Sequence, residues 1–215
     1  MLVAASLPAG GWEGPGAPSV RFSYRLSTGA PGPGTAGPPN KTTAGTEAGR
    51  FKRELVEYPI PLVSLVDSNG ASVRLDRLLE TREPVALQFI FTTCPGVCPT
   101  LTATLAALGR KVPEVRRVSI SIDPEVDTPA RMAEYKAQLG GGDGWSFLTG
   151  SRESSIAAQQ AFDAYRGEKM RHQPLTFVRP AGARGWRRIE GFPTVDELAR
   201  ELVPVPSPAR GRGPG

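Results

Sequence analysis

The sequence predicts an α/β fold in which helices flank a mixed β-sheet. A nearly continuous apolar run at Val85–Phe91 indicates a strand that is buried on both faces. A helical pattern follows it directly, and two late strands, Leu175–Val178 and Trp186–Ile189, are joined by a Gly-containing turn. This succession of paired strands, alternating strands and helices, and a closing helix is typical of a sheet covered by helices.

The remaining elements follow from the two periodicities of apolar residues, 2 for strands and 3.6 for helices. They are the hairpin strands Leu62–Val66 and Ser72–Leu75 around Asp67–Gly70, a helix bearing Leu101, Leu105 and Leu108, a strand Val115–Ile122, and helices with the inner stripes Met132–Tyr135–Leu139, Ala158–Phe162–Tyr165 and Val195–Leu198–Leu202.

Residues suited to helix starts stand before several of these helices. Pro99 suits a first turn, where no backbone N–H is needed. Thr128-Pro129 reads as a cap and first helical residue, and Ser151 starts the next helix. Thr194 and Glu197 form a capping-box pattern before the last helix.

This patterned region is flanked by segments of a different composition. Residues 1–50 hold ten glycines and seven prolines, so they cannot bury enough apolar surface to offset the entropy of ordering. We expect a disordered segment or linker over 1–50, one domain over 51–203 and a disordered tail over 204–215.

The net charge of +5 is not concentrated on the predicted domain. Residues 51–203 carry 20 basic and 19 acidic side chains, so we expect no nucleic-acid binding, which needs a basic face. No stretch approaches the roughly 20 apolar residues of a transmembrane helix. Met1–Leu7 is apolar but short and has no basic region before it, so it is no clear signal peptide.

Cys94 and Cys98 lie where the buried strand gives way to a helix. The N–H groups and partial positive charge of a helix start favour thiolate over thiol, so we expect a lowered pKa at one or both cysteines. Their spacing of four places both sulfurs on one side of the first helical turn, where they can close a disulfide or hold a metal. Two structural cysteines, or a static bridge, are the alternative.

A reactive strand-to-helix turn followed by late antiparallel strands is the thioredoxin arrangement. Thioredoxin-like proteins commonly hold a cis proline at the start of the late strand, so we predict that Pro174 is cis. His172, the one histidine of the chain, stands just before that strand and is expected to face the sulfurs. A surface or core histidine is the alternative.

Two thiolates and one imidazole form a soft, three-coordinate set that favours Cu(I) and also tolerates Cu(II). Structural zinc normally takes a fourth protein ligand, and none is evident, so copper is the preferred metal. Asp123, which follows the second strand of the pattern, is expected to act as a group behind the ligands. Asp127 or Thr128 is interpreted as a helix cap.

Two stretches, Phe89–Thr100 with its Cys94-Pro-Gly-Val-Cys98 motif and Ser119–Pro129 with Asp123-Pro and Asp127-Thr-Pro, resemble the Sco/SenC family of copper-binding thioredoxin-like proteins. The likeness runs from about residue 58 to 203. It implies that Cys94, Cys98 and His172 bind copper and that the protein helps to metallate or reduce the dinuclear copper site of cytochrome c oxidase. The implied partner is an oxidase subunit or another copper or thiol client, in the cell envelope, on the periplasmic or extracytoplasmic side.

The sequence departs from the family pattern at three places. Arg171 stands where an aspartate usually precedes the histidine, the segment before the histidine is shorter, and the usual membrane anchor is absent. Two functions therefore stay open. One is a copper chaperone, and the other is a thiol–disulfide oxidoreductase that reduces cysteines of an exported or oxidase-subunit client through a Cys94–Cys98 disulfide. A peroxidase is a weaker third option.

Overall fold

A nine-stranded mixed sheet forms the centre of the part of the chain that the computed structural model describes, residues 40–42 and 51–204. Its strands are β1 Asn40–Thr42, β2 Phe51–Glu57, β3 Ser64–Asp67, β4 Ser72–Arg74, β5 Val85–Ile90, β6 Arg116–Ser121, β7 Trp145–Thr149, β8 Leu175–Arg179 and β9 Trp186–Gly191. They lie in the order β1-β2-β9-β8-β5-β6-β7-β3-β4.

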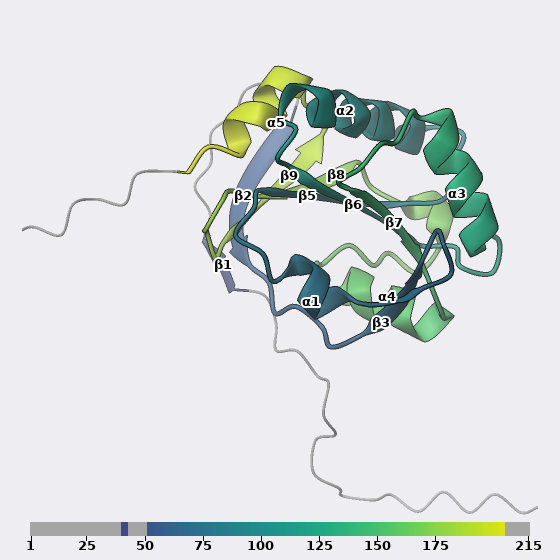
Figure 1. The fold of residues 1–215 in the computed structure, drawn as a ribbon. Helices are drawn as coiled ribbons and strands as arrows, with labels where there is room; N and C mark the ends of the chain where they lie inside the picture. The colour runs from purple at the N-terminus through teal and green to yellow at the C-terminus, as the bar shows by residue number, and fades with distance from the viewer. Residues whose placement is uncertain (1–39, 43–50, 205–215) are drawn as a thin grey trace, which may run out of the picture. The chain divides into compact units, whose positions relative to one another are not determined.

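Helices cover both faces of this sheet. They are α1 Leu75–Leu79, α2 Val97–Lys111, α3 Pro129–Gln138, α4 Arg152–Ala161, the 3₁₀ turn η1 Lys169–Arg171 and α5 Val195–Glu201. Helices α2, α3 and α5 lie on one face, and α1 and α4 on the other (Figure 1). The predicted α/β fold with a mixed sheet and flanking helices is confirmed. Within the described ranges, no helix has the length and apolar character to cross a bilayer.

The directions of the central strands bring three connections to one edge of the sheet. Strand β5 runs parallel to β6, with Ile90 beside Ser121, and antiparallel to β8. The carboxyl ends of β5 and β6 therefore meet the amino end of β8. Consequently, the cysteine loop after β5, the Asp123–Asp127 loop after β6 and His172 before β8 all lie at this edge.

The predicted helix starts are confirmed. The Thr128 hydroxyl accepts a hydrogen bond from the Arg131 amide at 3.3 Å, with Pro129 as the first helical residue. The Ser151 hydroxyl caps α4 in the same way. Thr194 and Glu197 satisfy each other's backbone amides in a capping box at α5. These capping side chains set the residue at which each helix begins.

Four elements differ from the prediction. Strands β7 and β2 were not predicted. Strand β7 buries Trp145, Phe147 and Leu148, whereas β2 has no apolar run and is held by its pairing with β9. Of β2 only Val56 is buried, and its Glu54 pairs with Arg188 of β9. Helix α1 begins at Leu75, where a strand was expected to end. Strand β1 lies within the predicted linker 1–50. The rest of that segment, and the tail after Pro204, lie outside the described residues.

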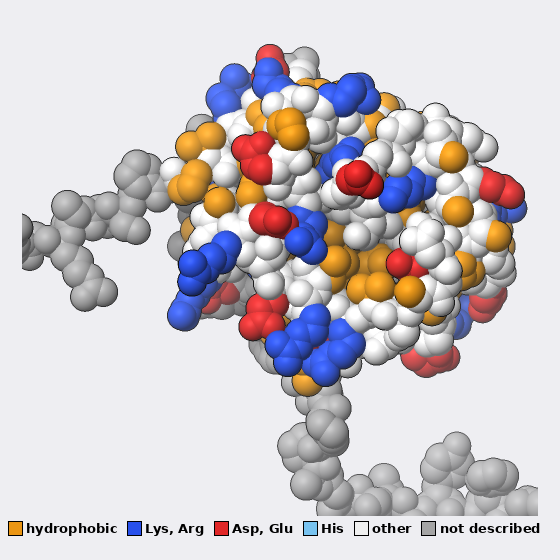
Figure 2. Space-filling view, in the orientation of Figure 1, with side chains coloured by type: hydrophobic (Ala, Val, Ile, Leu, Met, Phe, Trp, Pro, Cys, Tyr) orange, Lys and Arg blue, Asp and Glu red, His pale blue; other side chains and the backbone are white. Residues whose placement is uncertain are grey.

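The core consists of two apolar clusters, one on each face of the sheet. The α1 and α4 side is rich in aromatic rings, and Phe162 contacts Tyr58, Phe177 and Trp186 with ring centroids about 5 Å apart. The α2, α3 and α5 side contains Cys98. On the face that Figure 2 shows, acidic and basic side chains are interspersed and apolar side chains gather in a patch near its middle.

Candidate functional site

The start of α2 holds the two cysteines together. The Cys94 amide donates to the carbonyl of Phe91 at 3.1 Å, which closes a turn at the end of β5. Two residues after the helix cap Gly96, the Cys98 amide donates to the sulfur of Cys94 at 3.4 Å. The sulfur thus takes one of the amides that a helix start leaves without a partner. Both cysteines are free thiols.

The two sulfurs differ in burial. Cys98 is 1% exposed within the apolar cluster under α2, whereas Cys94 is partly exposed. Burial raises the pKa of the Cys98 thiol well above its usual range, and contact with Cys94 adds to this effect. We expected a lowered pKa at one or both cysteines, and at Cys98 this does not hold, because the desolvation of its thiolate outweighs the helix start.

His172 follows η1, and its imidazole lies edge-on to Phe91 with ring centroids 6.5 Å apart. Burial lowers the pKa of His172 to about 4, although a hydrogen bond to the backbone carbonyl of Phe89 favours the protonated form. Nε2 is buried and has no hydrogen-bond partner. A neutral imidazole keeps one ring nitrogen lone pair that can bind a metal ion.

The imidazole and the two sulfurs do not form a single group of ligands among the residues that the structure describes. The imidazole lines a cavity of about 460 Å³ between the Asp123–Asp127 loop, α4 and the segment from Ala164 to Met170. In the described part of the chain, no three Cys, His, Asp or Glu side chains are grouped so that they could share a metal ion. The structure thus brings Cys94 and Cys98 together and places His172 next to Phe91, which belongs to the same apolar cluster as Cys98.

The prediction that Pro174 is cis is wrong, because the peptide bond before it is trans. The Leu175 amide bonds to the Gln173 carbonyl at 2.9 Å, and the Pro174 carbonyl accepts the Gly191 amide at 2.8 Å. This tight turn and the pairing with the end of β9 lead the chain into β8 without a cis bond.

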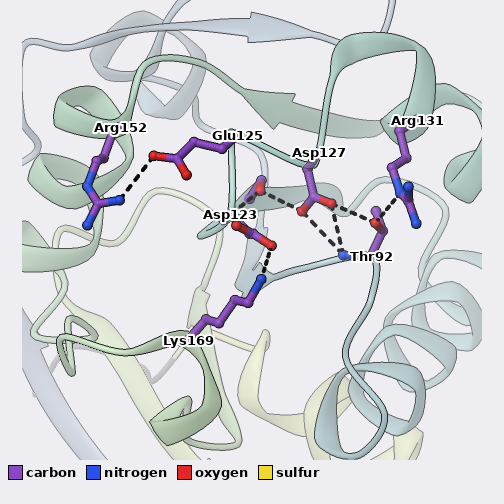
Figure 3. A network of polar contacts seen from close by, with 8 residues as sticks. Thr92, Asp123, Glu125, Asp127, Arg131, Arg152 and Lys169 are labelled. Carbon is purple, nitrogen blue, oxygen red and sulfur yellow. Dashed lines mark hydrogen bonds and ion pairs between the residues drawn. The ribbon is translucent and has the colours of Figure 1, made fainter.

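The two aspartates after β6 bind different segments, Asp123 pointing toward Lys169 and Asp127 toward Thr92 (Figure 3). Asp123 pairs with Lys169 at 2.5 Å, three residues before His172. Asp127 is not a helix cap, since Thr128 takes that role. Its carboxylate is instead buried and accepts hydrogen bonds from Thr92, two residues before Cys94. Sequence reasoning missed Thr92, although its place at the end of the buried strand was a signal.

Residues 62–189 match the SCO1/SenC family model. The chain belongs to the SCO1/SenC family. The SCO1 protein homolog of Bacillus subtilis (strain 168) is 32% identical over 113 residues, 50% of this chain and 58% of that protein. A SCO2-like protein of Rickettsia conorii is 35% identical over 75 residues, 33% of this chain and 36% of that protein. The chain thus matches between about a third and three fifths of the length of these relatives.

Solved SCO1/SenC structures share the predicted thioredoxin-like fold. BsSco, a Sco-family cytochrome c oxidase assembly protein with a disulfide switch, is 26% identical, with a TM-score of 0.57 over 68% of this chain and 92% of that one. Arabidopsis thaliana ScoI with copper bound is 26% identical, with a TM-score of 0.55 over 64% and 90%. A SCO1/SenC family lipoprotein from Bacillus anthracis str. Ames is 20% identical, with a TM-score of 0.59 over 68% and 94%.

The donor set of this SCO1/SenC chain fits a soft metal ion. The side chains of Cys94 and Cys98 interact at a helix start, and an imidazole nitrogen at the same edge of the sheet is buried without a partner. Of the buried side-chain polar atoms without a partner among the described residues, Nε2 of His172 is the one imidazole nitrogen, and neutral imidazole is the commonest metal ligand in proteins. Cys94, Cys98 and His172 are the residues that would hold copper here.

Proposed function

We propose that this chain binds copper through Cys94, Cys98 and His172 and delivers it to the dinuclear copper site of a cytochrome c oxidase subunit. The observation that carries the proposal is the contact between the Cys98 amide and the Cys94 sulfur at a helix start, at the same edge of the sheet as a buried imidazole nitrogen that has no partner. The copper-bound Arabidopsis thaliana ScoI, 26% identical over the shared fold, supports the choice of metal.

The two oxidation states of copper make different demands on these ligands. Two thiolates satisfy Cu(I), which prefers soft sulfur, while Cu(II) also requires the imidazole. Because His172 lies apart from the sulfurs in the metal-free arrangement, binding by all three ligands draws its segment toward Cys94. Cys94, the partly exposed sulfur, is the atom through which a client reaches the metal.

The same proposal places the chain in the cell envelope, on the periplasmic or extracytoplasmic side, where it would meet an oxidase subunit or another copper or thiol client. BsSco is an oxidase assembly protein, and the Bacillus anthracis family member is a lipoprotein. Both descriptions fit an envelope location.

A copper titration tests this function. We expect the reduced chain to bind one equivalent of Cu(I) in competition with a chromophoric Cu(I) chelator, and Cu(II) to give a sulfur-to-copper absorption band. Cys94→Ser or Cys98→Ser abolishes both, and His172→Ala weakens chiefly Cu(II) binding. Ser151→Ala, which touches only the cap of α4, is the control and leaves both unchanged. A reduced chain that binds no copper rules the function out.

A second function, thiol–disulfide exchange, is favoured by the unequal burial of the two sulfurs. The Cys94 thiolate would attack a client disulfide, and the Cys98 thiolate would then displace the client. The products are a Cys94–Cys98 disulfide and a client reduced by two electrons. The disulfide switch of BsSco supports this reading. Metal-free turnover of a protein disulfide that persists in His172→Ala would establish it, and an unreactive Cys94 would exclude it.

A further inference from the structure

A buried carboxylate anchors the loop that carries the cysteines. Asp127 is 0% exposed, and it accepts hydrogen bonds from the Thr92 hydroxyl at 2.6 Å, the Thr92 amide at 3.2 Å and the Ser121 hydroxyl at 2.6 Å. Among the described residues, no Lys or Arg forms an ion pair with it, so these donors alone stabilise its charge. Arg131 donates to the same Thr92 hydroxyl at 2.8 Å. Thr92 is thereby fixed two residues before Cys94.

The other end of the same loop holds the segment that carries His172. The Asp123 carboxylate pairs with Lys169 at 2.5 Å, and the Lys169 ammonium lies 5.7 Å from the centre of the Phe91 ring. Lys169 begins η1, and the His172 amide donates to its carbonyl at 3.1 Å. The ion pair and this turn set where the imidazole stands.

Ser121 joins the two ends. Its hydroxyl donates to Asp127 and accepts the Asp123 amide at 3.0 Å, so polar contacts run without a break from Thr92 to Lys169. Figure 3 shows this chain of contacts across the loop. Glu125, midway along the loop, pairs with Arg152 at 3.1 Å and takes no part in the chain. Glu125 therefore provides a matched control on the same loop.

We infer that the Asp123–Asp127 loop sets the spacing between the sulfur pair and the imidazole, with Asp127 and Asp123 as positioning residues for the cysteine loop and for His172. The inference rests on the proposed function, in which these groups are copper ligands. The loop has two arms, the contacts of Asp127 with Thr92 and the ion pair of Asp123 with Lys169, and disturbing each has a different consequence. Disturbing the Asp127 arm moves the sulfurs that both oxidation states need. Disturbing the Asp123 arm affects only the imidazole, which Cu(II) needs and Cu(I) does not.

Copper affinities of paired variants separate the two arms. Thr92→Val and Asp127→Asn are expected to weaken Cu(I) and Cu(II) binding about 10-fold each, while Thr92→Ser, which keeps the hydroxyl, stays within about 2-fold of wild type. Lys169→Met leaves Cu(I) unchanged and tightens Cu(II) about 2- to 5-fold. Its ion pair holds His172 where the three ligands do not converge, and losing a partly exposed pair shifts that balance modestly. Lys169→Arg and Glu125→Gln match wild type.

Hydrogen exchange of the metal-free chain gives a second readout. Thr92→Val speeds exchange in residues 91–98, Lys169→Met speeds it in residues 165–173, and Glu125→Gln does neither. If Thr92→Val resembles Glu125→Gln, or if Lys169→Met changes Cu(I) and Cu(II) alike, the inference is overturned while copper binding by the wild type stands. If the wild type binds no copper, the proposed function fails, and the exchange pattern alone supports or overturns the positioning of the two segments.

Discussion

The two segments that carry the candidate ligands are held by interactions of different kinds. The cysteine loop lies between β5, all of whose residues are buried, and the first turn of α2. The buried Asp127 carboxylate holds it through a hydrogen bond from Thr92. The segment before His172 is a single 3₁₀ turn, held by a partly exposed ion pair. The fold thus holds the sulfurs by buried contacts and the imidazole segment by a partly exposed one, which suits the proposed copper delivery.

Phe91, at the start of the cysteine loop, contacts the segment that carries His172. Its ring belongs to the apolar cluster of Cys98, meets His172 edge-on and lies under the ammonium of Lys169. It is 2% exposed, so both segments pack against a side chain that belongs to the core. Removing this ring is therefore expected to have the largest effect, because it loosens both segments at once.

We expect Phe91→Ala to lower the free energy of unfolding by about 3–5 kcal/mol, because it deletes a buried aromatic ring and leaves a cavity. The loss of the shared contact also loosens both segments, so exchange rises in residues 91–98 and in 165–173 together. Urea unfolding and hydrogen exchange measure the two effects. Phe91→Leu, which keeps most of the volume, is the control and costs less than about 1.5 kcal/mol. Faster exchange in one segment only would show that Phe91 does not couple them.

The cysteine loop was the more predictable of the two segments, for a physical reason. The apolar run of β5, Pro99 in the first turn of α2 and the leucines of that helix are local signals, and together they place both sulfurs at a helix start. The same local signals do not predict that Cys98 is buried. Its raised pKa depends on side chains that arrive from α3 and β7, far along the chain.

Other features of the fold and of the site depend on contacts that no local pattern encodes. Asp127 reads as a helix cap in the sequence, and only the meeting of β5 and β6 shows that its carboxylate is turned toward Thr92. The trans bond at Pro174 likewise reflects pairing with the end of β9. Strand β2, with only Val56 buried, takes its conformation from β9. Residues with strong local preferences were predictable, and residues defined by distant partners were not.

Acid is expected to destabilise the chain through the segment of His172, which is the one histidine of the chain. Its pKa is about 4 in the folded state and about 6.5 when unfolded, so the unfolded state binds more protons between these values. Stability of the metal-free chain therefore falls as the pH drops from 6.5 to 4, by about 2–3 kcal/mol from this group. His172→Asn removes that part of the pH dependence and leaves the carboxylate part. An imidazole that titrates near 6.5 by NMR would contradict the prediction.

The smallest expected effect compares two ion pairs beside the cavity of His172. In Lys169–Asp123 the carboxylate side chain is only 12% exposed, whereas in Arg152–Glu125 both partners are more than 60% exposed. Exposed pairs are screened by water and salt, so we expect Lys169→Met to lower the free energy of unfolding by at most about 1 kcal/mol, and Arg152→Met by less than about 0.3 kcal/mol. Urea unfolding at low and at high salt measures both, and salt should weaken the effect of Arg152→Met proportionately more, because the less exposed pair is screened less. Equal losses would mean that the burial of Asp123 does not strengthen its pair. The imidazole segment would then be held mainly by the contact with Phe91, and Lys169→Met would no longer be expected to tighten Cu(II) binding.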